Sequence, residues 1–301
     1  MGQLRLRGIY PPTVTPLNND ETIDEAGLRR LLDHLIVGGV HGFYLLGSTG
    51  EFAALRSSER RKAMEIAVDE VRGRVPIVAG ASAESTVRAV DNIGVAQECG
   101  VDAVAITPTY YYPTGGAAEQ IAHYKACVRS TDLPLVIYNI PQMTKVMLSP
   151  DTVGEIAELD GIIGIKDSSG DWTYMLNLLN RLQDDEDFSI LAGAPMLAAS
   201  HILMGGDGAV MGLGNLDPVT CVRLYESAKT HDLEELWRWQ RRVFDFSRVA
   251  TYGAPIVCYK TALMLMGICQ DHACAPFQSL SADARGDLAS TLRELGLVDT
   301  D

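Results

Sequence analysis

Residues 134–168, PLVIYNIPQMTKVMLSPDTVGEIAELDGIIGIKDS, contain two short apolar runs on either side of one helical pattern. The runs 134–141 and 161–168 are apolar at nearly every position, which is typical of strands buried on both faces of a parallel sheet. Between them, Ser149-Pro150-Asp151 is typical of a helix start, with a capping residue followed by proline and an acid. The segment therefore predicts one strand–helix–strand unit.

The same alternation extends over about 220 residues of the chain. Eight such alternations predict an α/β protein with a (β/α)₈ TIM barrel rather than an open doubly wound sheet. A second helix start, with a serine cap, is expected at Ser57-Ser58-Glu59. The expected strands are 8–16, 42–47, 76–82, 103–108, 134–141, 161–168, 189–193 and 208–212, and the expected helices are 24–38, 57–72, 85–99, 116–130, 149–159, 171–184, 195–205 and one from about 217.

The alternation stops after about residue 226. Segments 232–251, 254–268 and 281–296 all have helical patterns, with no strand-like run between them. We therefore expect two parts, a barrel over residues 1–225 and a C-terminal helical domain over residues 226–301.

Composition excludes several classes of protein. The 301 residues carry 39 acidic and 25 basic side chains, a net charge of −14, which argues against nucleic-acid binding but not against a small anionic substrate. No apolar run approaches the roughly 20 residues of a membrane helix, and no signal-peptide core is visible, so a cytoplasmic protein is expected. The six cysteines lack C-x-x-C spacing and are expected to be free thiols, and no metal or nucleotide motif is present.

Lys166 is the first candidate catalytic residue. It stands in the strand-like run 161–166, whose other members are isoleucine and glycine. Burial of an ammonium group there would favour the neutral amine, which is the form that attacks a carbonyl. The C-terminal ends of barrel strands also carry the catalytic residues of TIM barrels. The alternative is a structural ion pair with Asp167 or another carboxylate of the barrel.

Three further segments follow predicted strands. Gly47-Ser48-Thr49-Gly50-Glu51 is able to form a tight turn whose N–H groups bind a carboxylate, although a plain connecting turn is the alternative. Tyr138 ends a strand and is placed to relay a proton, or it is a core aromatic residue. The run Tyr110-Tyr111-Tyr112 cannot bury all three rings in one core, so it is expected to line a cleft or a subunit contact.

Taken in order, these segments resemble the family of pyruvate-dependent class I aldolases that includes dihydrodipicolinate synthase and N-acetylneuraminate lyase. The resemblance runs from about residue 8 to the C-terminal helices. It implies a TIM barrel with a helical C-terminal domain, a homotetramer, and catalysis without a metal or an organic cofactor. The matching residues are Gly47–Glu51, Thr107-Pro108 with Tyr110, Tyr138–Pro141 and Gly164–Ser168.

The same resemblance assigns roles to individual residues. Lys166 would form a covalent imine with a 2-oxo acid, pyruvate, and Tyr138 would relay protons. Ser48 would connect Tyr138 to Tyr110 of a neighbouring subunit, while the backbone amides of Ser48 and Thr49 would hold the carboxylate. Because a protonated imine accepts electrons, C3 of the bound pyruvate unit can gain or lose a bond to an aldehyde carbon.

The outer pocket departs from two branches of the family. Dihydrodipicolinate synthases carry an arginine where this chain has Met143, and a thioether cannot replace a bidentate guanidinium. Neuraminate lyases carry an acidic pair after the glycine that corresponds to Gly193, and a serine at the position of Leu213, whereas here Gly193 precedes Ala194-Pro195-Met196. We expect Gly193, Met143 and Leu213 to line a less polar substrate pocket, with simple barrel packing as the alternative.

The run 165–171, with Leu191-Ala192-Gly193, is most similar to aldolases of 4-hydroxy-2-oxoglutarate and of keto-deoxy sugar acids. The expected activity is therefore that of a Schiff-base lyase. It would cleave or form a 4-hydroxy-2-oxo acid or a 2-keto-3-deoxy sugar acid, with pyruvate and an aldehyde as the other reactants. One alternative is a 4-hydroxy-tetrahydrodipicolinate synthase, which condenses pyruvate with aspartate semialdehyde. The other is a barrel that binds pyruvate without catalysis.

Overall fold

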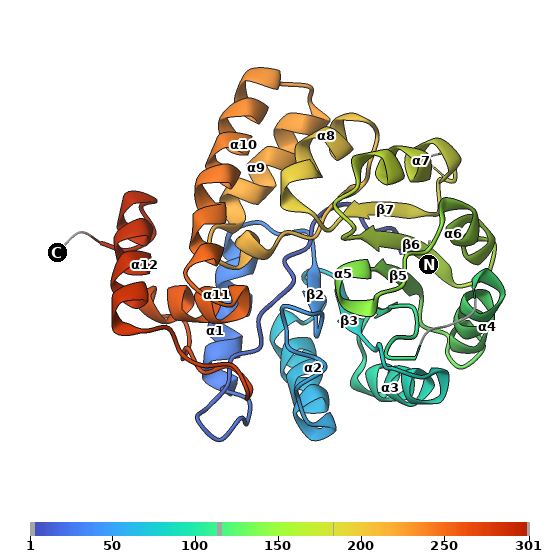
Figure 1. The fold of residues 1–301 in the computed structure, drawn as a ribbon, viewed down its shortest axis with the longest axis horizontal. Coiled ribbons are helices and arrows are strands. Elements are labelled where there is room, and N and C mark those ends of the chain that lie inside the picture. The colour runs from blue at the N-terminus through green and yellow to red at the C-terminus, as the bar shows by residue number, and fades with distance from the viewer. Residues whose placement is uncertain (1–3, 113–115, 183, 300–301) are drawn as a thin grey trace.

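A computed structural model of the chain describes residues 4–112, 116–182 and 184–299. Its strands form one sheet in the order β1-β8-β7-β6-β5-β4-β3-β2, and every neighbouring pair is parallel (Figure 1). Each of these strands lies within a range that the sequence predicted, and each is shorter than that range. They are β1 (Gly8–Ile9), β2 (Phe43–Leu45), β3 (Ile77–Gly80), β4 (Ala103–Ile106), β5 (Leu135–Asn139), β6 (Ile162–Asp167), β7 (Ser189–Ala192) and β8 (Gly208–Ala209).

The two ends of the sheet meet just beyond β1. Pro12 forms a parallel bridge with Tyr44 of β2. Around this bridge the Tyr44 N–H donates to the Pro11 carbonyl oxygen at 3.1 Å, and the Thr13 N–H donates to the Tyr44 carbonyl oxygen at 3.1 Å. The sheet therefore closes on itself, and the predicted (β/α)₈ barrel is confirmed.

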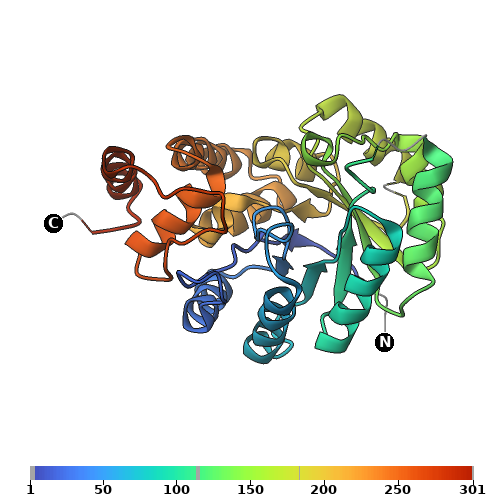
Figure 2. The ribbon, with the colours of Figure 1, turned by 60° about the horizontal axis from the view of Figure 1, so that its bottom comes forward.

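Helices cover the outside of the barrel between successive strands, as the alternation predicted (Figures 1 and 2). Short helical turns follow three strands: α5 (Pro141–Thr144), η1 (Pro195–Leu197) and η2 (Gly212–Asn215). The covering helices are α1 (Glu25–Val37), α2 (Ser57–Val71), α3 (Thr86–Cys99), α4 (Ala117–Val128), α6 (Pro150–Ala157), α7 (Trp172–Leu182), α8 (Ala198–Leu203) and α9 (Pro218–Lys229).

The two predicted serine caps have different outcomes. Ser149 caps α6, because its hydroxyl oxygen accepts a hydrogen bond from the Thr152 N–H at 3.1 Å. The prediction for Ser57 is wrong: Ser57 is the first residue of α2, and the capping position is taken by Arg56, whose backbone is extended and whose side chain makes no capping bond. The serine is already helical there and cannot reach forward to cap its own turn.

The C-terminal part consists of α10 (Leu233–Ser247), η3 (Arg248–Thr251), α11 (Pro255–Leu265) and α12 (Ala282–Glu294), which lie together at one side of the barrel (Figures 1 and 2). Helix α9 continues to Lys229, so the expected domain boundary at residue 225 falls inside this helix, and the division itself stays a prediction. The expected domains begin at residues 1–3 and end at residues 300–301, and the expected helix 171–184 includes residue 183. All of these residues lie outside the described ones.

The core has two layers. One packs the outer faces of the strands against the helices, and the other fills the inside of the barrel. Three tyrosines stand among the aliphatic residues of the inner layer. The inner layer consists of Leu6, Tyr10, Tyr44, Val78, Ala103, Ala105, Val136, Tyr138, Ile140, Ile163, Leu191 and Val210.

Candidate active site

Lys166 and Tyr138 stand side by side at the C-terminal ends of β6 and β5, where they are register partners. The register between the two strands shifts at Leu135/Val136, so that Val136 pairs with Gly164 instead of Ile163. Such an irregularity changes which face a side chain points to. Gly164 is required at the shift, because a Cβ atom there would collide with the Ser189 carbonyl group. Beyond the shift, Lys166 lies against the inner layer of the barrel.

The side chain of Lys166 is enclosed by aromatic rings. The residue is 3% exposed, and its Nζ lies 4.1 Å from the ring centre of Tyr44 and 3.9 Å from that of Tyr138. Among the described residues, no ion pair includes Lys166. The adjacent Asp167 instead accepts hydrogen bonds from Asn139 Nδ2 and Ser169 Oγ, both at 2.7 Å. The structural ion pair considered from the sequence is therefore not formed.

Burial controls the charge of Lys166. Loss of hydration lowers its pKa, and the neighbouring Tyr138 hydroxyl opposes this shift only in part. The two ring faces also attract a cation, and a desolvated contact of this kind contributes about 2 kcal/mol or more, but burying an unpaired ammonium costs far more. The lysine thus has a larger neutral fraction near neutral pH than an exposed lysine.

Tyr138 connects Lys166 to the turn after β2. Its phenol oxygen lies 3.4 Å from the Ser48 hydroxyl oxygen, within hydrogen-bonding distance. The ring of Tyr44 meets that of Tyr138 edge-on, with centres 5.6 Å apart, and holds it in place. Tyr44 was not identified from the sequence. It lies inside an apolar strand run, and its inward direction follows only from the closure of the barrel between β1 and β2.

The turn Gly47–Glu51 offers free backbone donors. The Ser48 carbonyl oxygen accepts from the Glu51 N–H at 3.2 Å, and the Thr15 hydroxyl donates to the Gly50 carbonyl oxygen at 2.8 Å. Among the hydrogen bonds of the described residues, the N–H groups of Ser48 and Thr49 donate to no protein acceptor. Two adjacent unpaired N–H groups form a site suited to a carboxylate.

The tyrosine run after β4 divides into two parts. Tyr110 is half-buried, and burial raises its pKa, with Glu84 acting in the same direction and Arg60 opposing it. Within the described part of the chain, no hydrogen bond joins Tyr110 to Ser48. Tyr111 and Tyr112 are 83% and 71% exposed, and Tyr111 has a left-handed backbone with φ of 79°. The expected subunit contact at this run stays a prediction.

The other predicted substrate-binding residues have different environments. Gly193 is next to the Lys166 strand, and its N–H donates to the Asp167 carbonyl oxygen at 2.6 Å. Met143, on α5, is 67% exposed, whereas Leu213, in η2, is 3% exposed and belongs to the core. Met196 lines an apolar groove between α8 and α10. Contact of Met143 and Leu213 with a substrate stays a prediction.

A buried ion pair behind the turn was also not identified from the sequence. Glu51 and Lys260 pair with side chains that are both 0% exposed. Lys260 Nζ also donates to the His272 carbonyl oxygen at 2.8 Å, and the Cys274 N–H donates to Glu51 Oε2 at 2.7 Å. The available signal was a lysine near the start of the apolar helix 254–268, but nothing in the sequence indicated its partner.

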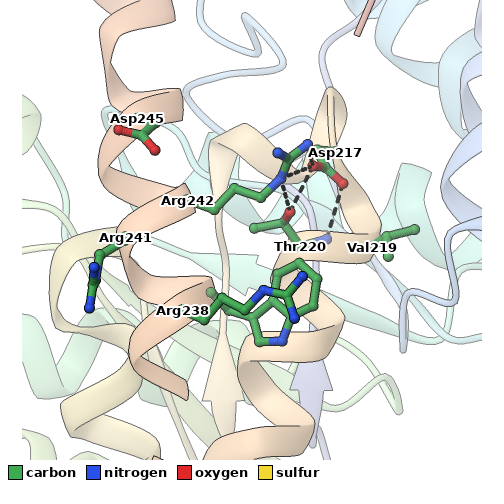
Figure 3. Close-up of a pocket in the computed structure, with 8 residues that line it drawn as sticks. Asp217, Val219, Thr220, Arg238, Arg241, Arg242 and Asp245 are labelled. Atoms are coloured by element: carbon green, nitrogen blue, oxygen red, sulfur yellow. Dashed lines mark hydrogen bonds and ion pairs between the residues drawn. The ribbon is translucent and has the colours of Figure 1, made fainter. Parts of the chain in front are cut away.

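A separate cavity of about 400 Å³ lies between α9 and α10. Figure 3 shows Arg242 of α10 reaching across to Asp217 and Thr220, which accept from its Nε at 3.0 and 2.9 Å. Asp217 is the capping residue of α9, so these bonds fasten α10 to the start of α9. The residues that line this cavity do not include Lys166, Tyr138 or Ser48.

In the described part of the chain, no group of three or more His, Cys, Asp and Glu side chains is arranged to hold a metal ion. Within the same residues, no helix is long and apolar enough to span a membrane. All six cysteines are free, as expected.

Comparisons with known proteins give one family. The sequence pattern of the "Dihydrodipicolinate synthetase family" matches residues 5–295. The chain is 38% identical to the 4-hydroxy-tetrahydrodipicolinate synthase of Methanothermobacter thermautotrophicus, over 88% of this chain and 94% of that protein. It is 33% identical to the synthase of Phenylobacterium zucineum, over 97% and 98%.

Solved structures that resemble this chain belong to the same family. A dihydrodipicolinate synthase from Bacteroides thetaiotaomicron superposes with a TM-score of 0.93 at 38% identity, covering 98% of this chain and 100% of that one. A prophage protein of the same family from E. coli K12, in complex with pyruvate, superposes with a TM-score of 0.92 at 28% identity, covering 97% and 99%. The chain therefore belongs to the dihydrodipicolinate synthetase family, which confirms the resemblance, the fold and the assignment as a lyase of the Schiff-base class.

Proposed function

We propose that this protein is a pyruvate-dependent lyase in which Lys166 forms the covalent imine. One observation carries the assignment: Lys166 is a buried lysine without a carboxylate partner, enclosed by the rings of Tyr44 and Tyr138. A structural lysine at this depth needs an anion to compensate its charge. A lysine that must be neutral to attack a carbonyl needs the opposite environment, and Lys166 has it.

The chemistry follows from these neighbours. The neutral amine of Lys166 attacks the C2 carbonyl of a 2-oxo acid, and water leaves as the protonated imine forms. In the cleavage direction the C3–C4 bond breaks, its electron pair enters the imine to give an enamine, and the C4 hydroxyl loses its proton as the aldehyde departs. Protonation at C3 and hydrolysis then release pyruvate. Tyr138, hydrogen-bonded to Ser48, is the group we assign to these proton transfers.

The turn after β2 is the proposed carboxylate site. Its unpaired Ser48 and Thr49 N–H groups would hold the carboxylate of the 2-oxo acid, and the Ser48 hydroxyl would remain with Tyr138. This arrangement needs no metal, because the imine itself accepts the electron pair.

The preferred substrate is a 4-hydroxy-2-oxo acid or a 2-keto-3-deoxy sugar acid, cleaved to pyruvate and an aldehyde. Met143 carries no charge for the carboxylate of aspartate semialdehyde, and Leu213 lacks the hydroxyl found at this position in neuraminate lyases, so the chain departs from both of these branches. A second candidate is the condensation of pyruvate with aspartate semialdehyde, which is favoured by the names of the relatives at 38% and 33% identity.

A two-part experiment tests these statements. Borohydride added with pyruvate should fix a covalent adduct, and peptide mass mapping should place it at Lys166. A panel of 2-oxo acids, followed by coupled reduction of released pyruvate, is then compared with consumption of aspartate semialdehyde. Absence of an adduct at Lys166 contradicts the mechanism, and faster semialdehyde consumption than pyruvate release selects the second candidate.

We also infer a homotetramer in which the tyrosine run 110–112 reaches a second copy, with Tyr110 completing the relay at the neighbour's Ser48. The support is the exposure of Tyr111 and Tyr112, two adjacent aromatic rings with centres 5.2 Å apart and no core to enter. Light scattering gives the mass of the particle. If the wild-type protein is monomeric and fully active, this inference is wrong.

A further inference from the structure

A buried ion pair attaches the turn that carries the unpaired N–H groups to the C-terminal helical part. Glu51, the last residue of the turn, pairs with Lys260 of α11, and neither side chain is exposed. The same carboxylate accepts the Cys274 N–H, and the same ammonium donates to the His272 carbonyl oxygen. Three segments therefore meet at two charges: the turn, α11, and the chain around residues 272 and 274.

The backbone at Glu51 needs such an anchor. Its φ of 58° lies in the left-handed region, which costs free energy for any residue other than glycine. Leu46, at the other end of the turn, also has a positive φ, 50°. A turn held in this conformation at both ends persists only where its surroundings fix it. At one end, the fixing group is the carboxylate of Glu51.

Net stability does not explain a fully buried ion pair. The cost of removing both charges from water generally equals or exceeds their attraction, and apolar replacements of both partners are often as stable or more stable. What such a pair does supply is a defined position, because each partner loses much more when it is displaced than an apolar side chain does. The position of Glu51 in turn constrains Ser48, because the Glu51 N–H donates a hydrogen bond to the Ser48 carbonyl oxygen.

We propose that Glu51 and Lys260 are positioning residues, through which the C-terminal helical part sets the geometry of the Ser48–Thr49 turn and thereby the affinity for the carboxylate of the 2-oxo acid. This role rests on the proposed function, because it presupposes that the turn binds a carboxylate. Neither residue touches the reacting atoms in this account. Their effect is on how strongly pyruvate is held, not on whether Lys166 is reactive.

Three variants separate positioning from plain stability. Lys260→Met leaves the Glu51 carboxylate buried without compensation and is expected to destabilise the fold. The double variant Glu51→Gln/Lys260→Met removes both charges with little change in volume. We therefore expect it to regain the stability lost in Lys260→Met, but not the fixed geometry of the Ser48–Thr49 turn. Leu263→Ala, on the same helix and 0% exposed, is the matched control, because it weakens the core and keeps the ion pair.

The measurement is the concentration of carbonyl compound that gives half-maximal borohydride trapping at Lys166. Pyruvate is compared with acetaldehyde, which has a carbonyl group and no carboxylate. In the double variant we expect the half-maximal concentration of pyruvate to rise by about tenfold, the scale expected when a binding group is misplaced by a fraction of an ångström. The acetaldehyde value should stay within about twofold of the wild type. Leu263→Ala should leave both values unchanged.

The two possible failures are distinguishable. If pyruvate does not trap the wild-type protein at Lys166, the proposed function is wrong, and the positioning role falls with it. If the wild type is trapped but the folded double variant has an unchanged pyruvate value, only the positioning role is wrong. Equal increases in the half-maximal concentrations of pyruvate and acetaldehyde would also contradict the positioning role, because a general loss of structure affects the trapping of both compounds alike.

Discussion

Two lysines of this chain are almost completely removed from water, and their surroundings are opposite. Lys166, in the barrel, is 3% exposed and faces the rings of Tyr44 and Tyr138. Lys260, in the C-terminal helical part, is 0% exposed and faces the carboxylate of Glu51 and the His272 carbonyl oxygen. Depth of burial alone does not distinguish them.

What distinguishes them is the compensation of charge. Lys260 has the carboxylate of Glu51 and the His272 carbonyl oxygen beside its Nζ, and both stabilise a positive charge there. Lys166 has only ring faces and a phenol, so burial favours the neutral form and the lone pair becomes available. A buried lysine is therefore a nucleophile or a structural cation according to whether a carboxylate stands beside it. Four experiments test this contrast.

The largest effect is expected from Lys166→Ala. Loss of the amine removes the imine, so turnover of every 2-oxo acid should fall to the uncatalysed background while the circular dichroism spectrum stays that of the wild type. In wild-type protein, borohydride and pyruvate should label the peptide that contains Lys166 and leave Lys260 unmodified. Label at Lys260 would break the comparison, because it would mean that a paired lysine also reacts.

Tyr138→Phe should have the next largest effect. It keeps the ring beside Lys166 and removes the hydroxyl that lies 3.4 Å from Ser48. Loss of a general acid–base group costs a factor on the order of 10²–10⁴ in turnover. Borohydride trapping with pyruvate at long incubation should still succeed, since the amine remains. Turnover within a factor of two or so of the wild type would remove Tyr138 from the mechanism.

The third experiment measures the cost of burying Lys166 as a function of pH. The pKa of Lys166 is lowered in the folded protein. At pH values between that lowered pKa and about 10.4, the value of a free lysine, the unfolded chain therefore binds more protons than the folded protein does. In that window the stability of the wild type rises with pH. Lys166→Met removes the titrating group, so its stability advantage over the wild type should shrink as the pH rises toward about 10.4.

Urea unfolding at several pH values between neutral and alkaline gives this difference directly. Lys125→Met, which removes an exposed lysine of α4, is measured at the same pH values as the control for loss of a lysine at another place. A stability difference for Lys166→Met that grows with pH has the wrong sign and would mean that the folded protein stabilises the charged amine.

The sequence predicted most of the barrel and the centre of the site. Strands such as 134–141 and 161–168 could be recognised because burial on both faces leaves a largely apolar run, and Lys166 was conspicuous as a charge that directly follows the isoleucine and glycine residues of 161–165. The helix start at Ser57 was misplaced, since a serine before an acid does not reveal whether the preceding residue, Arg56, already occupies the extended capping position.

Long-range pairing was not predictable in this way. Tyr44 resembles any apolar strand residue until the bridge from Pro12 to Tyr44 shows that the barrel closes there. Glu51 and Lys260 come from parts of the chain that no local pattern connects, and each has an ordinary local explanation, a turn acid and a helix lysine. Their pairing follows from how the C-terminal helices pack against the barrel, which depends on shape rather than on periodicity.

The smallest effect is expected from Tyr44→Phe, which tests what the aromatic surroundings of Lys166 contribute. The Tyr44 hydroxyl is buried and has no hydrogen-bond partner among the described residues, and burial raises its pKa, so it stays a neutral phenol. Removing it should leave the free energy of unfolding unchanged or raise it by about 1 kcal/mol, because an unpaired buried hydroxyl is a cost. Urea unfolding measures this change.

The same variant separates the ring of Tyr44 from its hydroxyl. The ring face that Lys166 meets at 4.1 Å remains in Tyr44→Phe, so the rate of borohydride trapping and its dependence on pH should match those of the wild type. Tyr138→Phe is the comparison variant. Each of the two variants removes one tyrosine hydroxyl near Lys166, but only Tyr138→Phe is expected to slow turnover. If Tyr44→Phe slows trapping as much as Tyr138→Phe slows turnover, the amine depends on a bound water or substrate group at that hydroxyl. Lys166 would then have a second polar neighbour besides the Tyr138 phenol, and its contrast with Lys260 would be one of partner type rather than of pairing.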